Sequence, residues 1–100
     1  MYGILIRYTY SGDEAAWRAA IDTFISAIDG DDEVGGRFTY SVNVGADGEN
    51  RIHVGRWDSD ETLALVQSRD YFKTFAGQVQ GFAGDSLTPM RFSNVTSTGQ

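Results

Sequence analysis

His53 has the clearest capacity for acid–base chemistry, because it is the only histidine in a chain of 100 residues. An imidazole titrates near neutral pH and can act as a general base or as a proton shuttle. Arg7 and Arg91 lie in segments typical of strands, and both could stabilise negative charge on a ligand if they project into one cavity. The alternatives are structural: a hydrogen-bonded histidine and arginines that form salt bridges.

Four further side chains could shape a binding site for a small molecule. Tyr40 and Trp57 could stack on a flat aromatic ligand, and Ser41 and Asn43 could supply hydrogen bonds. Each has a plainer role as a core aromatic residue or as part of a solvated face. We expect no metal site, because a lone histidine falls short of the roughly three protein ligands of a catalytic metal. We also expect no cofactor, because the glycines match no phosphate-binding or dinucleotide pattern.

The composition excludes several classes of function. Eight basic residues against fourteen acidic ones give a net charge of -6. Nucleic acids and anionic membrane surfaces both require a basic stripe, which this sequence lacks. The absence of cysteine excludes disulfides and thiolate catalysis. With no signal peptide and no long apolar segment, the sequence predicts a soluble cytoplasmic protein, with a mature secreted chain as the alternative.

The first half of the chain predicts three strands and a helix. A segment rich in β-branched and aromatic residues predicts a strand over Tyr2–Tyr10. Ser11–Glu14 matches a capping box, and the amphipathic helix that follows should end at Asp29–Gly30. Strict alternation predicts a strand at Arg37–Val44, and a turn signal joins it in a hairpin to a strand at Asn50–Trp57.

The second half predicts a helical segment and a final strand. Asp58 and Glu61 form a second possible capping box, and the helix should end within Gly81–Gly84. Ser68–Asp70 is a possible interruption, since Ser and Asp favour a new N-cap. A last strand over Leu87–Val95 contains the only proline near its start, which suits an edge position.

The order βαββαβ predicts a ferredoxin-like α+β sandwich, in which two helices cover one face of a four-stranded antiparallel sheet. We expect a single domain over residues 1–96 and a disordered tail over residues 97–100.

The region after the third strand also resembles a known family. Trp57 closes that strand, Asp58–Thr62 forms a short polar cap, and Tyr71, Phe72 and Phe75 are spaced along the following helix. This pattern is similar to that of the dimeric α/β-barrel superfamily, which includes antibiotic-biosynthesis monooxygenases and small stress-responsive proteins. Members often carry a histidine nine residues after the tryptophan, where this chain has Val66.

The resemblance implies a homodimer in which two sheets pack face to face and enclose a ligand site in the lumen of the barrel. It implies a cofactor-independent, monooxygenase-like enzyme acting on an aromatic or polyketide-like substrate. In that chemistry His53 would be the base and Arg7 or Arg91 would stabilise an anion. The alternative is a non-catalytic dimer of the same fold that binds a ligand or serves in regulation.

The predicted uncovered face of the sheet supports a partner or a pocket. A lone sandwich should present a polar face to water, but the alternation predicts a mixture of apolar and polar side chains there, which suits an interface or a pocket lining. Its predicted members are Leu5, Arg7, Thr39, Ser41, Asn43, His53, Trp57, Arg91, Ser93 and Val95.

Overall fold

The structure, a computed structural model, describes residues 1–99 and contains four strands, three α-helices and a short 3-10 helix. In chain order these are β1 (Tyr2–Thr9), α1 (Glu14–Asp29), β2 (Phe38–Val44), β3 (Asn50–Trp57), α2 (Asp60–Gln67), α3 (Asp70–Ala83), η1 (Gly84–Ser86) and β4 (Thr88–Ser93). No helix or strand follows β4 in the described part, and position 100 of the predicted tail lies outside the described residues.

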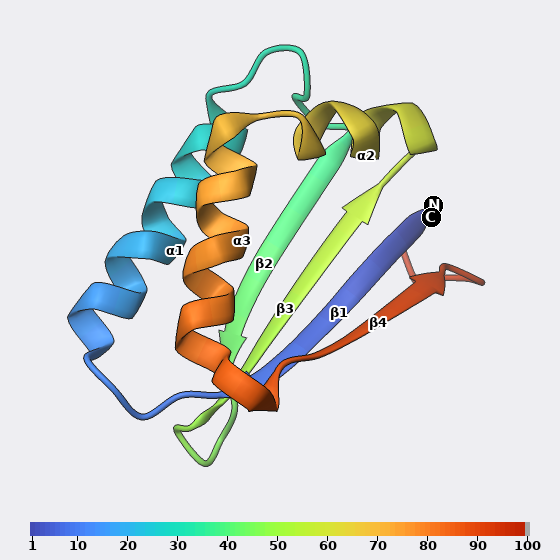
Figure 1. The fold of residues 1–100 in the computed structure, drawn as a ribbon. Coiled ribbons are helices and arrows are strands. Elements are labelled where there is room, and N and C mark those ends of the chain that lie inside the picture. The colour runs from blue at the N-terminus through green and yellow to red at the C-terminus, as the bar shows by residue number, and fades with distance from the viewer. Residues whose placement is uncertain (100) are drawn as a thin grey trace.

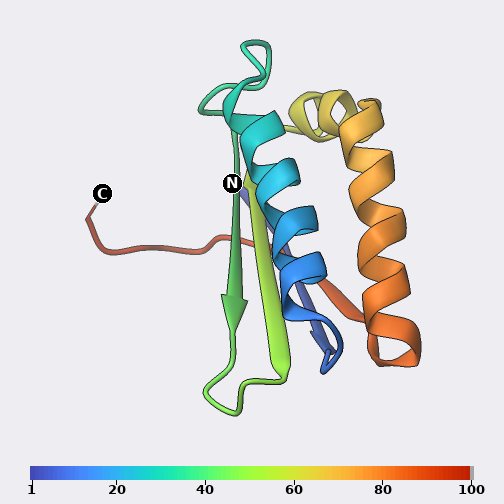
Figure 2. The same ribbon diagram turned by 90° about the vertical axis from the view of Figure 1, so that its left-hand side faces the viewer.

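The four strands form one antiparallel sheet in the order β2-β3-β1-β4. Figure 1 shows α1 and α3 running side by side over the sheet, and Figure 2 shows both on the same side of it. This is the predicted ferredoxin-like α+β fold. The final strand occupies an edge, as its proline predicts, because Pro89 then needs no second partner strand.

The core forms where the apolar stripes of α1 and α3 meet the covered face of the sheet. Trp17, Phe24 and Ile28 of α1 are buried, as are Phe75 and Val79 of α3. The rings of Phe24 and Phe75 stack with their centroids 3.8 Å apart. This aromatic contact fixes the two long helices against each other above the sheet.

The first helix is capped differently from the prediction. Asp13, rather than Ser11, is the N-cap, and its carboxylate accepts hydrogen bonds from the backbone N–H groups of Ala15 and Ala16. The capping-box prediction was therefore wrong. Glu14 does not reach back to the chain before the helix, because its carboxylate pairs with Arg51.

The second helical segment also begins one residue later than predicted. Ser59 is the N-cap of α2, and its hydroxyl accepts from the backbone N–H of Thr62, while the carboxylate of Asp58 accepts from the Thr62 hydroxyl. The predicted interruption at Ser68–Asp70 is confirmed, because α2 ends at Gln67 and α3 starts at Asp70. The cap of α3 is Arg69, whose side chain makes no capping hydrogen bond and instead contributes to an ion-pair cluster with the loop before β2.

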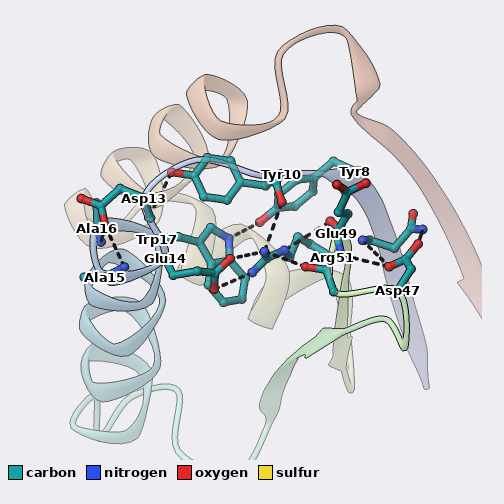
Figure 3. A network of polar contacts seen from close by, with 12 residues as sticks. Tyr8, Tyr10, Asp13, Glu14, Ala15, Ala16, Trp17, Asp47, Glu49 and Arg51 are labelled. Carbon is teal, nitrogen blue, oxygen red and sulfur yellow. Dashed lines mark hydrogen bonds and ion pairs between the residues drawn. The ribbon is translucent and has the colours of Figure 1, made fainter.

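Arg51 connects the start of α1 to the sheet. Its guanidinium is 1% exposed and donates to both carboxylate oxygens of Glu14, as Figure 3 shows. It also donates to the backbone carbonyl oxygens of Tyr10, Gly48 and Glu49. Its charge lies 4.3 Å from the centroid of the Trp17 ring. A buried guanidinium requires this many partners because leaving any donor without an acceptor is costly.

No helix in the described part of the chain is long and apolar enough to cross a membrane.

Because the buried guanidinium of Arg51 joins the start of α1 to the sheet, replacing Arg51 should destabilise the fold strongly. In Arg51→Met the carbonyl oxygens of Tyr10, Gly48 and Glu49 lose their donor, and we expect the free energy of unfolding to fall by about 2–4 kcal/mol. Urea unfolding would measure the loss. The matched control is Arg18→Met, which removes an exposed pair with Asp22 and should change stability by less than about 0.5 kcal/mol. Equal effects of the two substitutions would contradict a structural role for Arg51.

Candidate functional site

The third strand places its odd-numbered side chains under the helices. Arg51, His53, Gly55 and Trp57 are all buried, while the residues between them are only partly buried. His53 is paired with Ile6 on one side and Val42 on the other, and directly paired residues project to the same face of a sheet. The prediction that His53 and Trp57 lie on the uncovered face was therefore wrong.

The error has a physical cause. The sequence of β3 alternates apolar Ile52 and Val54 with Arg51 and His53, so hydrophobicity alone points the wrong set toward the core. The structure buries Arg51 and His53 because each finds internal hydrogen-bond partners, which offsets the cost of removing a polar group from water.

Both ring nitrogens of His53 are occupied. Nε2 lies 2.8 Å from the Tyr8 hydroxyl, and Nδ1 lies 2.8 Å from the Tyr40 hydroxyl. The Tyr8 hydroxyl in turn accepts a hydrogen bond of 2.9 Å from the Trp17 indole N–H. The ring of His53 is 0% exposed and stacks on Phe75 of α3. His53 therefore has no free nitrogen for a substrate in this arrangement.

Burial sets the ionisation of these groups. Removal from water disfavours the charged imidazolium and lowers the pKa of His53 to about 4. Burial also raises the pKa of Tyr40 well above its usual value, and it raises the pKa of Tyr8 although the hydrogen bond from Trp17 acts in the opposite direction. At neutral pH all three side chains are uncharged.

A cavity of about 270 Å³ lies between the covered face of the sheet and α2 and α3. Tyr40 and Trp57 line it from the sheet, and Leu63, Phe72 and Phe75 line it from the helices. Its volume is just below the range of roughly 300–1,000 Å³ that is usual for small-molecule pockets. The cavity therefore has room for a small, flat molecule between aromatic walls.

Gly55 makes room for one of these walls. A Cβ atom at this position would lie 3.0 Å from the Tyr40 ring, which is tighter than nearly all such contacts in proteins. The absence of a side chain at Gly55 lets the Tyr40 ring pack over β3.

Two polar groups of the lining have no hydrogen-bond partner among residues 1–99. The indole N–H of Trp57 is buried and, among the described residues, makes no hydrogen bond. Arg91 also lines the cavity, with its guanidinium 5.1 Å from the centroid of a Trp57 ring, and it forms no ion pair or hydrogen bond with residues 1–99. Buried donors are normally satisfied, so the Trp57 N–H favours a ligand that carries an acceptor oxygen. Arg91 is exposed, and its guanidinium adds a positive charge to the lining.

The other predicted site residues lie elsewhere. Arg7, Ser41 and Asn43 project from the uncovered face, as predicted: Arg7 donates a long hydrogen bond of 3.4 Å to Asn50, and Asn43 donates to the backbone carbonyl oxygen of Ile52. Arg91 is paired with Ile4, which puts it on the covered face.

Arg7 and Arg91 therefore do not share one cavity, and the prediction that they would was wrong. Arg7 is in β1 and Arg91 is in the adjacent strand β4, but their side chains project from opposite faces of the sheet. Two further residues predicted on the uncovered face are also misplaced: Ser93 is paired with Tyr2 on the covered side, and Val95 lies beyond β4 and is 94% exposed.

The helical lining was not predicted as a site. In the sequence, Phe72 and Phe75 indicate only a helix and the family resemblance, and Gln67 and Gln80, which border the cavity, carry no signal of a site. No group of three or more potential metal-binding side chains occurs in the described residues.

No protein-family profile matches this sequence, and no curated protein matches it. Solved structures of the same fold are found nonetheless. Rv0793 from Mycobacterium tuberculosis is 17% identical, with a TM-score of 0.78 and coverage of 98% of each chain. A mutant form of SnoaB, a cofactor-independent oxygenase from Streptomyces nogalater, is 10% identical, with a TM-score of 0.78 and coverage of 99% of this chain and 97% of that one.

A third structure is a candidate antibiotic biosynthesis monooxygenase from Nitrosomonas europaea. It is 11% identical, with a TM-score of 0.77, and the match covers 96% of this chain and all of the other. At these identities the likeness establishes the fold. It confirms the predicted structural resemblance to the antibiotic-biosynthesis monooxygenases.

The buried histidine should make stability depend on pH. The unfolded chain binds a proton at His53 near its ordinary pKa of 6.5, whereas the folded protein does so only near pH 4. Between these values the unfolded state holds more protons, so stability rises with pH. As the pH falls across this window, the wild type should lose up to about 3 kcal/mol more than His53→Gln, which keeps a donor and an acceptor but does not titrate.

Denaturant unfolding at several pH values would measure this difference. The carboxylates of Asp31 and Glu14, whose pKa values are lowered by their hydrogen-bond partners, are common to both proteins and cancel in the comparison. Parallel pH dependences of the two proteins would show that His53 is not buried as a neutral group.

Proposed function

We propose that this chain binds a small, flat, oxygen-bearing molecule in the cavity under α2 and α3, and oxidises it without a cofactor as a monooxygenase-like enzyme. The observation that carries the proposal is the buried Trp57 N–H, which has no partner among residues 1–99 and belongs to a ring whose centroid lies 5.1 Å from the Arg91 guanidinium. An aromatic or polyketide-like substrate suits the aromatic walls, and its phenol or carbonyl oxygen would complete the unused donors.

The proposed reaction needs no electrons from the protein. In an anthrone-like substrate, a ring CH₂ that is conjugated with the carbonyl through the flanking aromatic rings loses a proton to give an enolate-type anion, and this anion reduces O₂. One oxygen atom ends in a new C=O group, and the other leaves as water with the two hydrogens of the CH₂. The protein has to desolvate the substrate and stabilise the anion.

The geometry revises the roles expected from the sequence. Arg91 and the Trp57 N–H are the anion-stabilising groups, and Tyr40 with Trp57 forms the wall on the sheet side. His53 does not line the cavity, and its hydrogen bond to Tyr40 connects it to the lining. Arg7, Ser41 and Asn43 project toward the lumen that a second sheet would enclose.

The second candidate function is a non-catalytic dimer that binds a ligand or serves in regulation. One observation favours it: the described residues that line the cavity include no carboxylate and no imidazole. A general base must come within hydrogen-bond reach of the proton that it removes. The binding module needs only the cavity and its donors, and it uses the same residues.

We also propose a homodimer formed through the uncovered face, in the cytoplasm. Apolar side chains there are incompletely buried: Leu5, Val54 and Phe92 are partly exposed, and Met90 is 63% exposed. Packing a second copy against this face would remove them from water.

Substitutions in the cavity should separate the two functions. Incubation with anthrone-like phenols under O₂, followed by absorbance, should show oxidation by the wild type. Arg91→Gln should lower kcat/KM about tenfold to a hundredfold, because a charged hydrogen bond to the anion is lost, and Trp57→Phe should lower it about tenfold. Arg18→Gln, an exposed change on α1, is the control and should leave turnover unaltered.

Two outcomes would redirect the assignment. Thermal stabilisation by these compounds without turnover would favour the binding module. Neither turnover nor stabilisation with any compound of the class would contradict the cavity as a ligand site.

The mass of the particle in solution tests the dimer. Light scattering should give about 22 kDa, twice the 11.0 kDa of the chain. Val54→Glu would bury a charge at the centre of the interface and should shift the particle toward the monomer. The control is Val44→Glu, on the covered side at the end of β2, where the side chain is already 50% exposed. A stable 11 kDa particle for the wild type would contradict the dimer.

A further inference from the structure

A line of hydrogen bonds runs through the core and ends beside the cavity. It begins at Trp17 on α1, continues through Tyr8 on β1 and His53 on β3, and ends at Tyr40 on β2. The three links measure 2.9, 2.8 and 2.8 Å. Of the four residues, only Tyr40 lines the cavity.

The direction of these hydrogen bonds follows from the chemistry of the first residue. An indole N–H can only donate, so the Tyr8 oxygen accepts from Trp17. If His53 also donated from Nε2 to Tyr8, the Tyr8 hydroxyl proton would have no acceptor among residues 1–99. Tyr8 is 1% exposed, and an unpaired buried donor is costly. The satisfied arrangement has Tyr8 donating to Nε2.

This direction determines the tautomer of His53. A neutral imidazole has one N–H and one acceptor nitrogen. With Nε2 accepting from Tyr8, the ring proton is on Nδ1 and is donated to the Tyr40 oxygen. The Tyr40 hydroxyl proton then has no acceptor among the described residues and remains available to a molecule in the cavity that Tyr40 lines.

We propose that the Trp17–Tyr8–His53 chain makes Tyr40 a hydrogen-bond donor to the cavity, so that the site takes its ligand through an ionised oxygen, as a phenolate or enolate. His53 is then a positioning residue that orients Tyr40, and it is not the base. The inference rests on the proposed function in one respect, that the cavity of Tyr40 and Trp57 is the ligand site.

The rest of the lining agrees with this polarity. The Trp57 N–H is a donor with no acceptor, and Arg91 can only donate. Together with Tyr40 they provide three donors, and no carboxylate lines the cavity in the described residues. Aligned hydrogen bonds also polarise one another, which strengthens the terminal donor. Such a site binds an oxyanion more tightly than the corresponding hydroxyl group.

The tautomer can be measured without any ligand. Nitrogen NMR of protein labelled at histidine should show a single neutral ring with the proton on Nδ1 at pH 7, since His53 is the only histidine. Tyr8→Phe removes the hydroxyl group that donates to Nε2 of His53. The tautomer with its proton on Nδ1 should then no longer be the main form of the ring. A ring protonated only on Nε2, or doubly protonated, in the wild type would overturn the proposal.

The preference for an anion can be measured with para-nitrophenol, whose absorbance distinguishes phenol from phenolate. The wild type should bind the phenolate at least about tenfold more tightly than the phenol, which lowers the pKa of the bound probe by about one unit. Tyr40→Phe should reduce this preference several-fold. Tyr8→Phe should reduce it too, although Tyr8 does not line the cavity.

Controls separate this effect from a general loss of structure. Tyr71→Phe removes a tyrosine hydroxyl that pairs with Asp31 outside the chain and should leave the pKa of the bound probe unchanged. If Tyr8→Phe does not fold, Trp17→Phe removes the first donor and should weaken the preference in the same direction. An unaltered preference in the chain variants that fold, or tighter binding of the phenol, would overturn the proposal.

The outcomes also distinguish this inference from the proposed catalysis. A lowered pKa of the bound probe without oxidation of anthrones would remove the monooxygenase assignment and leave the anion site standing. Oxidation of anthrones by a protein whose His53 carries its proton on Nε2 would support the monooxygenase assignment and overturn the proposed role of Tyr40 as a donor. Failure of the probe to bind would overturn the anionic-ligand class itself.

Discussion

Every polar atom that β3 buries beneath the helices must find a partner, and the rest of the structure depends on how that requirement is met. An unpaired buried donor costs about 1–3 kcal/mol. The donors of Arg51 are taken by Glu14 and by backbone carbonyls, and both nitrogens of His53 are taken by tyrosines. The Trp57 N–H alone is left without a partner among residues 1–99. One strand therefore runs from a structural end at Arg51 to the proposed binding end at Trp57.

The same aromatic residues serve the core and the cavity. Phe75 stacks on Phe24 and on His53, and it also lines the cavity together with Tyr40. Unfilled apolar space lowers the stability of a small domain, and a ligand that fills it restores the lost contacts. Because Tyr40 touches the core, the cavity and His53 at once, its hydroxyl is oriented by groups that no ligand can reach.

The proposed function assigns separate tasks to the two faces of the sheet. The covered face supplies Trp57, Tyr40 and Arg91 to the cavity, whereas the uncovered face presents Arg7 with its partly exposed apolar neighbours. A second copy packed on the uncovered face would not occupy the cavity, because the sheet lies between them. The proposed assembly and the proposed ligand binding would therefore change independently, although both involve the same four strands.

The sequence by itself determined the fold, because helical and strand periodicity, the break near Ser68 and the edge proline are local signals that tertiary contacts reinforce. It did not determine which face of β3 is buried. Ile52 and Val54 are more apolar than Arg51 and His53, and only the partners supplied by β1, β2 and α1 reverse that preference. The position of the cavity and the neutral state of His53 follow from this choice, whereas the separation of Arg7 from Arg91 follows from the register between β1 and β4. Tertiary structure decided them, because hydrogen-bond partners distant in sequence offset the cost of burying polar groups.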